Sequence, residues 1–185
     1  MKEDPFDDTP ILMQAYDIMS QAEVVVTWYG EGHDFHFLNT RLARIGKYLD
    51  YRMKHIDLYK VASRSLRLSS NRLDNVAAYF GEERKMKISK TLWPDCWAGN
   101  HDSLMKLSEY CRQDCDVLAA VYDHMVNLKT GLPHMGHMKG LDPKKTCEVC
   151  GGDKLWSKGH RWTTTGKYQR LQCQACGNHQ KGEKI

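Results

Sequence analysis

The sequence lacks any apolar run long enough to cross a bilayer, for which about 20 consecutive apolar residues are needed. Its start, MKEDPFDDTP, is acidic and polar and so lacks the basic and apolar regions of a secretory signal. Internal repeats and low-complexity tracts are also missing. These absences argue against a membrane, exported or repeat protein, and they predict an intracellular globular chain.

Net charge is small, but it is unevenly distributed. The 185 residues, 41% of them hydrophobic, suffice for one core with a small appended module. Residues 1–141 hold 18 Lys/Arg against 19 Asp/Glu, whereas residues 142–185 hold 9 against 4. A basic tail suits contact with nucleic acid, although a solvated basic surface is the commoner meaning of so modest an excess.

The seven cysteines fall into two groups. Cys147-x-x-Cys150 and Cys173-x-x-Cys176 form two pairs separated by 22 residues, a spacing slightly longer than is common for zinc sites. Four thiolates in two such pairs predict a structural Zn²⁺ with tetrahedral coordination. The scattered Cys96, Cys111 and Cys115 are predicted to be reduced core residues.

Between the cysteine pairs, two β-prone segments flank Gly166 and predict a β-hairpin, which makes this tail a zinc ribbon. Aromatic and basic residues alternate there, as expected of a surface that stacks bases and neutralises phosphates. We predict a nucleic-acid contact by Arg161, Trp162, Tyr168 and Arg170, with Trp156 nearby. The alternative is that the aromatics cover the small ribbon core, which we expect of at least two of them.

Upstream of the tail, helical and β-branched segments alternate, which indicates an α/β fold. The predicted elements are a helix from Thr9, a strand at 23–28 that is buried on both faces around Val24–Val26, a helix at 37–49, a strand at 55–58, helices at 58–66 and 73–80, and a long helix at 101–128. We expect Gly81 to end the helix at 73–80 as a C-cap in the left-handed conformation. The predicted domains are 1–130, a Gly- and Pro-rich linker at 131–145, and the ribbon at 146–185.

The long helix carries an unusual carboxylate. Apolar residues recur at helical spacing and predict one buried stripe: Leu104, Leu107, Cys111, Leu118, Val121 and Met125. Asp114 falls within this stripe, and burying a lone charge costs roughly several kcal/mol unless it is paired or binds a metal. Tyr110, one turn earlier, places a phenolic hydroxyl beside it, which suggests phosphodiester chemistry.

A second carboxylate, Asp34, follows the Val-rich strand, where α/β proteins place functional groups. Gly30 and Gly32 let the backbone turn sharply before it. Asp34 is either a metal ligand or the N-cap of the next helix, since Asp is a favoured cap.

These motifs resemble the DEDD group of 3′–5′ exonucleases, in particular virus-encoded relatives of the proofreading domain of family-B DNA polymerases. The likeness covers most of the chain. Asp34, Leu38, Asn39 and Arg41 look like the second motif of that family, and Tyr110, Asp114, Leu118 and Tyr122 look like its third motif in the tyrosine variant. Segments 55–59 and 69–81 resemble its middle region.

The resemblance implies a ribonuclease-H-like domain, with a mixed sheet flanked by helices, that hydrolyses DNA from 3′ ends. In such enzymes two divalent ions about 4 Å apart activate water and stabilise the leaving oxygen. Asp34 and Asp114 would hold Mg²⁺ or Mn²⁺, Tyr110 would orient the water, and Asn39 and Arg41 would contact nucleic acid. Asp57 and Asp116 are weaker ligand candidates, for which surface or capping roles are expected.

The chain departs from the family pattern at two places. Tyr29 and His33 stand where the family has Asn and Phe before the second-motif aspartate. The first motif, Asp-x-Glu on an opening strand, is missing: residues 1–22 offer no apolar strand, and Glu3 and Asp4 lie in a polar start. With half the usual carboxylates, the isolated chain is expected to bind Mg²⁺ weakly and to show little activity.

Three hypotheses therefore stand. The first is a virus-encoded exonuclease-like protein in the cytoplasm of a host cell, acting on DNA more than on RNA. The second is a catalytically silent nucleic-acid-binding module. The third is a subunit of a split nuclease or polymerase complex whose missing strands come from a partner chain, because an incomplete sheet exposes a strand edge.

Overall fold

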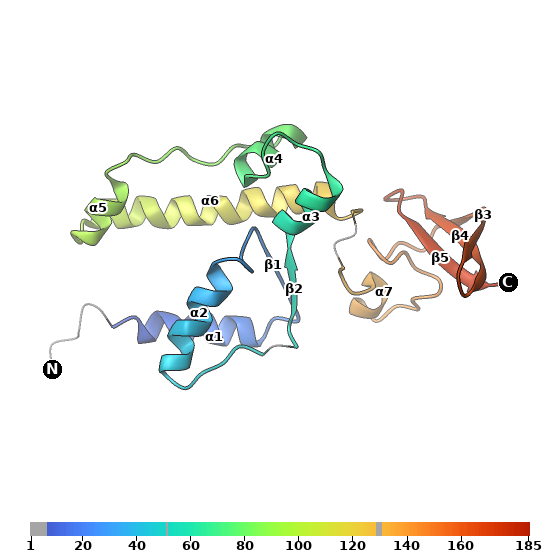
Figure 1. Ribbon diagram of the computed structural model, residues 1–185, viewed down its shortest axis with the longest axis horizontal. Coiled ribbons are helices and arrows are strands. Elements are labelled where there is room, and N and C mark those ends of the chain that lie inside the picture. Colours follow the sequence, from blue (N-terminus) through green and yellow to red (C-terminus); the bar gives the residue numbers. More distant parts are fainter. Residues whose placement is uncertain (1–6, 51, 129–130) are drawn as a thin grey trace. The chain divides into compact units, whose positions relative to one another are not determined.

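The computed structural model describes residues 7–50, 52–128 and 131–185 (Figure 1). The chain forms two compact units, Met1–Met125 and Val126–Ile185. Glu3 and Asp4 lie outside the described residues. Among the described helices, none combines the length and the apolar character that crossing a membrane requires.

The N-terminal unit alternates helices with two short strands, as the sequence predicts. Its elements are α1 (Thr9–Ser20), β1 (Val24–Thr27), α2 (Asp34–Arg44), β2 (Lys54–Asp57), α3 (Leu58–Ser65), α4 (Leu73–Phe80), α5 (Leu92–Trp97) and α6 (His101–Met125). The expected end of α4 is confirmed, because Gly81 caps it in the left-handed region with φ 81°. Helix α5 was not predicted from the sequence.

Strands β1 and β2 pair in parallel, with Val24 opposite Lys54 and Thr27 opposite Asp57, and α2 lies in the connection between them. Within the described residues each strand pairs with the other alone, so the observed sheet is parallel and two-stranded rather than mixed. The prediction that Val24–Val26 is buried on both faces is wrong: all β1 residues are half-buried. A two-stranded sheet has too few neighbours to enclose them.

Helix α6 contributes Val117, Val121 and Met125 to the core, and it packs against α4 and α5 (Figure 1). The predicted stripe is wrong in its first half, because Leu104 is 45% exposed and Cys111 is also exposed. Helical periodicity identifies an apolar face but cannot tell whether another element covers it. Here the short α5 is the described helix that packs beside this half.

The scattered cysteines are also not core residues. Cys111 and Cys115 are exposed and Cys96 is half-buried. The expectation that these three cysteines are core residues is therefore wrong.

The C-terminal unit contains α7 (Met135–Met138) and an antiparallel sheet in the order β3 (Leu155–Thr163), β4 (Gly166–Cys173) and β5 (His179–Lys184). The predicted hairpin around Gly166 is thus present, and β5 adds a strand that the sequence did not reveal. Its buried described residues are Gly136, Thr146, Cys147, Cys173 and Gln180. Apart from the two cysteines, this unit buries no large apolar side chain among the described residues.

Candidate active site and four-cysteine cluster

The candidate active site lies where β1 and β2 end, at the carboxyl edge of the parallel pair. The Asp57 carboxylate accepts hydrogen bonds from the backbone N–H groups of Tyr29 at 2.9 Å, Glu31 at 3.2 Å and Tyr59 at 3.0 Å. Asp57 therefore caps α3 and fixes the loop that follows β1. This confirms the capping role expected for it and leaves its oxygens committed to the backbone.

The loop after β1 has a constrained shape. Tyr29 adopts a left-handed conformation with φ 65°, which is uncommon for a residue other than glycine. A Cβ atom at Gly30 would lie 2.6 Å from the Thr27 Oγ1 atom, and one at Gly32 would lie 2.7 Å from the Tyr29 ring. Glycine is thus required at both positions for the backbone to approach so closely. The Tyr29 ring packs edge-to-face on Tyr59, with 5.0 Å between centroids.

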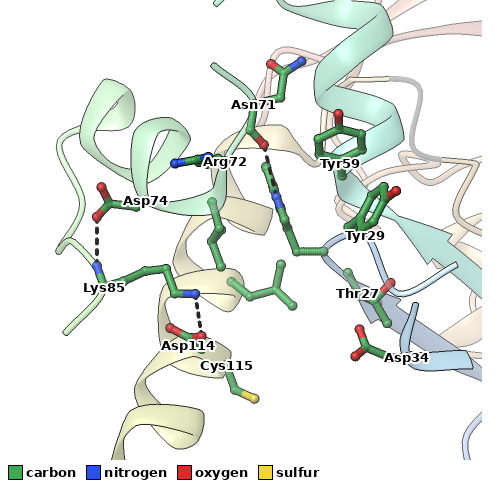
Figure 2. Close-up of a pocket in the computed structure, with 14 residues that line it drawn as sticks. Thr27, Tyr29, Asp34, Tyr59, Asn71, Arg72, Asp74, Lys85, Asp114 and Cys115 are labelled. Carbon is green, nitrogen blue, oxygen red and sulfur yellow. Dashed lines mark hydrogen bonds and ion pairs between the residues drawn. The ribbon is translucent and has the colours of Figure 1, made fainter. Parts of the chain in front are cut away.

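A cavity of about 780 Å³ opens beside this loop, and Asp34 and Asp114 both line it (Figure 2). Asp34 is the first residue of α2, whereas His33 occupies the N-cap position. The N-cap interpretation of Asp34 is therefore wrong, and its exposed carboxylate borders the cavity instead. The helix that carries Asp114, α6, is 80 residues further along the chain, counted from Asp34 to Asp114.

Asp114 is held by Lys85, a residue that the sequence analysis did not single out. The Lys85 Nζ atom lies 2.6 Å from Asp114 Oδ2, and the Lys85 backbone N–H donates to Asp74 at 3.2 Å (Figure 2). Gln113 fixes the same segment by accepting a hydrogen bond from the Met86 N–H at 2.6 Å. The signal in the sequence was weak, because Lys85 lies in an irregular segment among other basic residues.

The ammonium of Lys85 remains charged across the neutral range. Burial tends to lower its pKa, but hydrogen bonds to Asp114 and Tyr110 outweigh this and raise the pKa above its ordinary value. The stabilisation from this ion pair is therefore complete at neutral pH and is lost only as pH rises through the elevated pKa. Tyr110 is not among the residues that line the cavity, but its ring neighbours Lys85, whose Nζ lies 5.1 Å from the Tyr110 ring centroid.

Two buried oxygens remain without hydrogen-bond partners among the described residues, Asp114 Oδ1 and Asn71 Oδ1, and both residues line this cavity. A buried acceptor without a partner is costly, and a hard cation such as Mg²⁺ prefers carboxylate and amide oxygens. Asp74 also borders the cavity, but it is engaged by Arg84 at 3.3 Å and by the Lys85 N–H. Asp34 and Asp114 are thus the carboxylates suited to hold a divalent ion.

Other residues singled out from the sequence lie outside the cavity lining. Arg41 pairs with Asp8, and Asn39 is exposed on α2. Asp116 is exposed on α6, in agreement with the surface role expected for it.

In the C-terminal unit, Cys147, Cys150, Cys173 and Cys176 place their Sγ atoms within 4.8 Å of one another. Cys147 and Cys176 are 3.6 Å apart at sulfur, as are Cys150 and Cys173. Sulfurs bound tetrahedrally at a zinc–sulfur distance of about 2.3 Å would be about 3.8 Å apart, so the cluster fits such a metal ion.

The thiols of this cluster differ in their acidity. Burial tends to raise the pKa of Cys173, but hydrogen bonds from the N–H groups of Cys176 and Ala175 outweigh it and lower the pKa to about 7. Burial instead raises the pKa of Cys176 to about 12. Since metal ligation needs thiolates, an ion that binds here displaces protons, and its affinity falls as the solution is acidified.

The first unit is thus an α/β domain in which two carboxylates line one cavity beside the ends of parallel strands. Residues 1–126 match the protein family described as the RNase_H superfamily. This match covers more than half of the chain, and the chain belongs to that superfamily.

The chain is also similar to a DNA polymerase from Methanocaldococcus jannaschii, with 27% identity over 129 residues. The matched region covers 58% of this chain and 8% of the polymerase. The chain therefore spans only a small part of that relative's length, and the two comparisons together indicate a nuclease-like, nucleic-acid-binding class of protein.

Proposed function

We propose that this protein acts on DNA 3′ ends as a 3′–5′ exonuclease-like protein of the DEDD group in its tyrosine variant, by two-metal hydrolysis. Its site is incomplete on its own in this proposal, because the first motif, Asp-x-Glu, is missing from the sequence. The observation that carries the proposal is that Asp34 and Asp114 line one cavity, with Asp114 Oδ1 buried and without a hydrogen-bond partner in the described part of the chain. Membership of the RNase_H superfamily and the similarity to a DNA polymerase support it. The virus-encoded origin and host-cytoplasmic location suggested by the motifs belong to the same proposal.

In this mechanism Asp34 and Asp114 would hold Mg²⁺ or Mn²⁺, and the bound ion would supply activation of water and neutralisation of charge on the leaving oxygen. Lys85 keeps Asp114 in place through Oδ2 and leaves Oδ1 for the ion. Tyr110 orients the attacking water, and the aromatic rings of Tyr29 and Tyr59 bound the cavity in which the terminal nucleotide lies.

The C-terminal unit acts, in this proposal, as a zinc ribbon that grips nucleic acid. Cys147, Cys150, Cys173 and Cys176 hold structural Zn²⁺. Arg161, Tyr168 and Arg170 contact the strand in this proposal, as do Asn39 and Arg41 in the first unit. Trp162, which the sequence also suggested as a contact, lies on the opposite side of the sheet from Tyr168 and is left out of the binding set.

A second candidate function is a catalytically silent binding module or a subunit of a split nuclease. Two observations favour it: Lys85 already neutralises Asp114, and the described sheet leaves the outer edges of β1 and β2 unpaired. A strand from a partner that pairs with one of these edges would complete the sheet and bring further carboxylates. Light scattering combined with a nuclease assay distinguishes a split subunit from a self-sufficient exonuclease, because a monodisperse monomer with nuclease activity contradicts the split-subunit proposal.

The polarity of degradation tests the first proposal directly. With Mn²⁺, we expect single-stranded DNA labelled at its 5′ end to yield a ladder of progressively shorter products on a denaturing gel. The same DNA labelled at its 3′ end should release labelled mononucleotide in the first turnovers, because hydrolysis begins at that end. Internal cuts without early mononucleotide release would identify an endonuclease and contradict the proposal.

Replacing Lys85 tests how the ion pair affects metal binding. We expect Lys85→Met to bind Mn²⁺ about fivefold more tightly than wild type, because removing a neighbouring ammonium relieves a repulsion on the order of 1 kcal/mol. Isothermal titration calorimetry measures this affinity. Lys87→Met is the matched control, since Lys87 is an exposed lysine two residues along the same segment. Equal or weaker Mn²⁺ binding in Lys85→Met would mean that Lys85 chiefly positions Asp114.

A further inference from the structure

The three-stranded sheet of the C-terminal unit has two chemically different faces. Directly opposed residues of antiparallel strands point to the same face, and neighbours along a strand point to opposite faces. Arg161 lies opposite Tyr168, whereas Trp162 lies opposite Lys167. The aromatic residues of the hairpin are therefore divided between the two sides of the sheet.

One side, the Tyr168 face, holds alternate residues of β4 and the residues of β3 and β5 that lie opposite such positions. Its members are Trp156, Arg161, Tyr168, Arg170, Lys181 and Lys184. Side-chain geometry agrees with this register, because the Lys181 Nζ atom lies 4.2 Å from the Tyr168 ring centroid. Likewise, a Cβ atom on Gly166 would lie 2.8 Å from Lys184 Cε, so this lysine crosses the hairpin on that side.

The other side faces the four-cysteine cluster. Leu155 lies opposite Cys173 and Ser157 opposite Leu171, and Cys173 and Gln180 are both buried. Trp162 shares this side and interacts with Lys167, whose Nζ lies 5.7 Å from its ring centroid. Trp162 is 75% exposed, yet it lies on the opposite side of the sheet from Tyr168.

The Tyr168 face combines the exposed ring of Trp156 and the half-buried ring of Tyr168 with positive charge. Trp156 is 56% exposed, and Arg161, Arg170, Lys181 and Lys184 are all exposed. Residues 154–185 carry seven Lys/Arg (Lys154, Lys158, Arg161, Lys167, Arg170, Lys181 and Lys184) against Glu183 as their one acidic side chain. Few carboxylates are present to repel a polyanion, so this face complements phosphates.

The order of groups along the face follows the path of a single strand. Trp156 is opposite Gln172, and Gln172 is four residues from Tyr168 on β4, a separation of about 13 Å along the strand. Arg170 and Lys181 are paired with each other between these two rings. Arg161 and Lys181 also border a cavity of about 710 Å³. Two rings separated by cations match bases stacked on either side of a stretch of phosphates.

We propose that the Tyr168 face binds single-stranded nucleic acid by stacking bases on Trp156 and Tyr168, while Arg170 and Lys181 neutralise the phosphates between them. Duplex is a poor ligand, because its paired bases cannot lie flat on the rings. Trp162 takes no part, since it is on the other side of the sheet. This binding deepens the ribbon's proposed role and needs no hydrolysis.

The test is fluorescence anisotropy with the zinc-loaded full chain and oligo(dT) of about 15 nucleotides, without added Mg²⁺ or Mn²⁺. Trp156→Ala and Tyr168→Ala should each raise Kd roughly 10-fold, the effect of losing one stacked base. Trp162→Ala is the matched control and should leave Kd within about twofold. Zinc content and circular dichroism must match wild type in all three variants, which separates lost contacts from lost folding.

Two further measurements complete the experiment: the dependence of Kd on salt concentration, and the Kd for other nucleic-acid ligands. Arg170→Ala combined with Lys181→Ala should lower the slope of log Kd against log salt by about 1.4, or about 0.7 for each phosphate contact. Oligo(rU) in place of oligo(dT) distinguishes RNA from DNA, and a hairpin duplex should bind at least about tenfold more weakly. A Trp162→Ala effect as large as that of Trp156→Ala, or duplex binding as tight as single-strand binding, overturns the proposal.

If the exonuclease proposal fails, the proposed binding by the Tyr168 face can still hold. If the Tyr168 face does not bind nucleic acid, the exonuclease proposal can still hold. A chain that binds oligo(dT) through Trp156 and Tyr168 without degrading it in Mn²⁺ supports the Tyr168 face and contradicts the hydrolase. A chain that degrades DNA but binds equally well after both ring substitutions supports the hydrolase and contradicts the Tyr168 face.

Discussion

Asp114→Asn is expected to reduce Mn²⁺-dependent degradation of single-stranded DNA at least about 100-fold, because losing a partner in the outer shell of a metal site alone costs 10- to 100-fold. The substitution keeps the size of the side chain but removes its charge and replaces one acceptor oxygen with an N–H donor group. Asp114 Oδ1 is buried and has no hydrogen-bond partner among the described residues, so the proposed ion would lose an anionic ligand. The measurement is initial rate of mononucleotide release.

Asp116→Asn is the matched control for this result. Asp116 lies two residues further along α6, is exposed, and is outside the cavity lining. Removing its charge changes the net charge of the protein by the same amount, so its rate should stay within about twofold of wild type, as expected of a surface substitution away from the site. Equal losses in both variants would show that general charge, rather than metal ligation, controls the rate.

Asp114→Asn also distinguishes the exonuclease proposal from the silent-module proposal for the first unit. If Asp114→Asn abolishes hydrolysis, Asp34→Asn should do so as well, because both carboxylates line one cavity. If wild type is inactive and Asp114→Asn leaves Mn²⁺ affinity unchanged, the carboxylate is satisfied by Lys85 and the silent module is the better account.

Local rules predicted the parts of the fold that local contacts determine. The end of α4 at Gly81 and the cap of α3 at Asp57 each follow from the conformation or hydrogen bonding of one residue, and both are present. Asp34 and Asp114 line one cavity, and the resemblance to a family suggested that they belong to one site. Spacing alone would not give it, because the two residues are far apart in the sequence and on different helices.

What could not be predicted depends on tertiary surroundings. Lys85 is in an irregular segment with no periodicity, so nothing in its neighbourhood indicated that its ammonium meets Asp114. The exposure of Leu104 depends on what covers α6, not on the helix itself. Whether Trp162 and Tyr168 lie on the same or on opposite faces of the sheet depends on strand register, because a shift by one residue moves a side chain to the other face.

The second large effect is expected in the C-terminal unit. Cys147→Ser should lower the zinc content from about one ion per chain to near zero and unfold the sheet β3–β5, because the binding energy of a structural zinc, roughly 10–16 kcal/mol, is also folding energy. Cys111→Ser is the control, since Cys111 is exposed on α6 and outside the cluster. Zinc is measured by mass spectrometry, and unfolding by hydrogen exchange.

The size of this effect follows from what the unit buries. Its buried described residues are two cysteines, one glycine and the polar Thr146 and Gln180, so no Leu, Ile, Val or Phe core remains when the thiolates lose their ion. A unit of this size without a hydrophobic core does not fold unaided. Deuterium uptake should therefore rise across residues 147–185 of Cys147→Ser but not across the first unit, whose core includes Leu42, Val76 and Val121. A sheet that stays protected without zinc would mean that Thr146 and Gln180, which are hydrogen-bonded to each other at 3.0 Å, hold the unit through polar contacts.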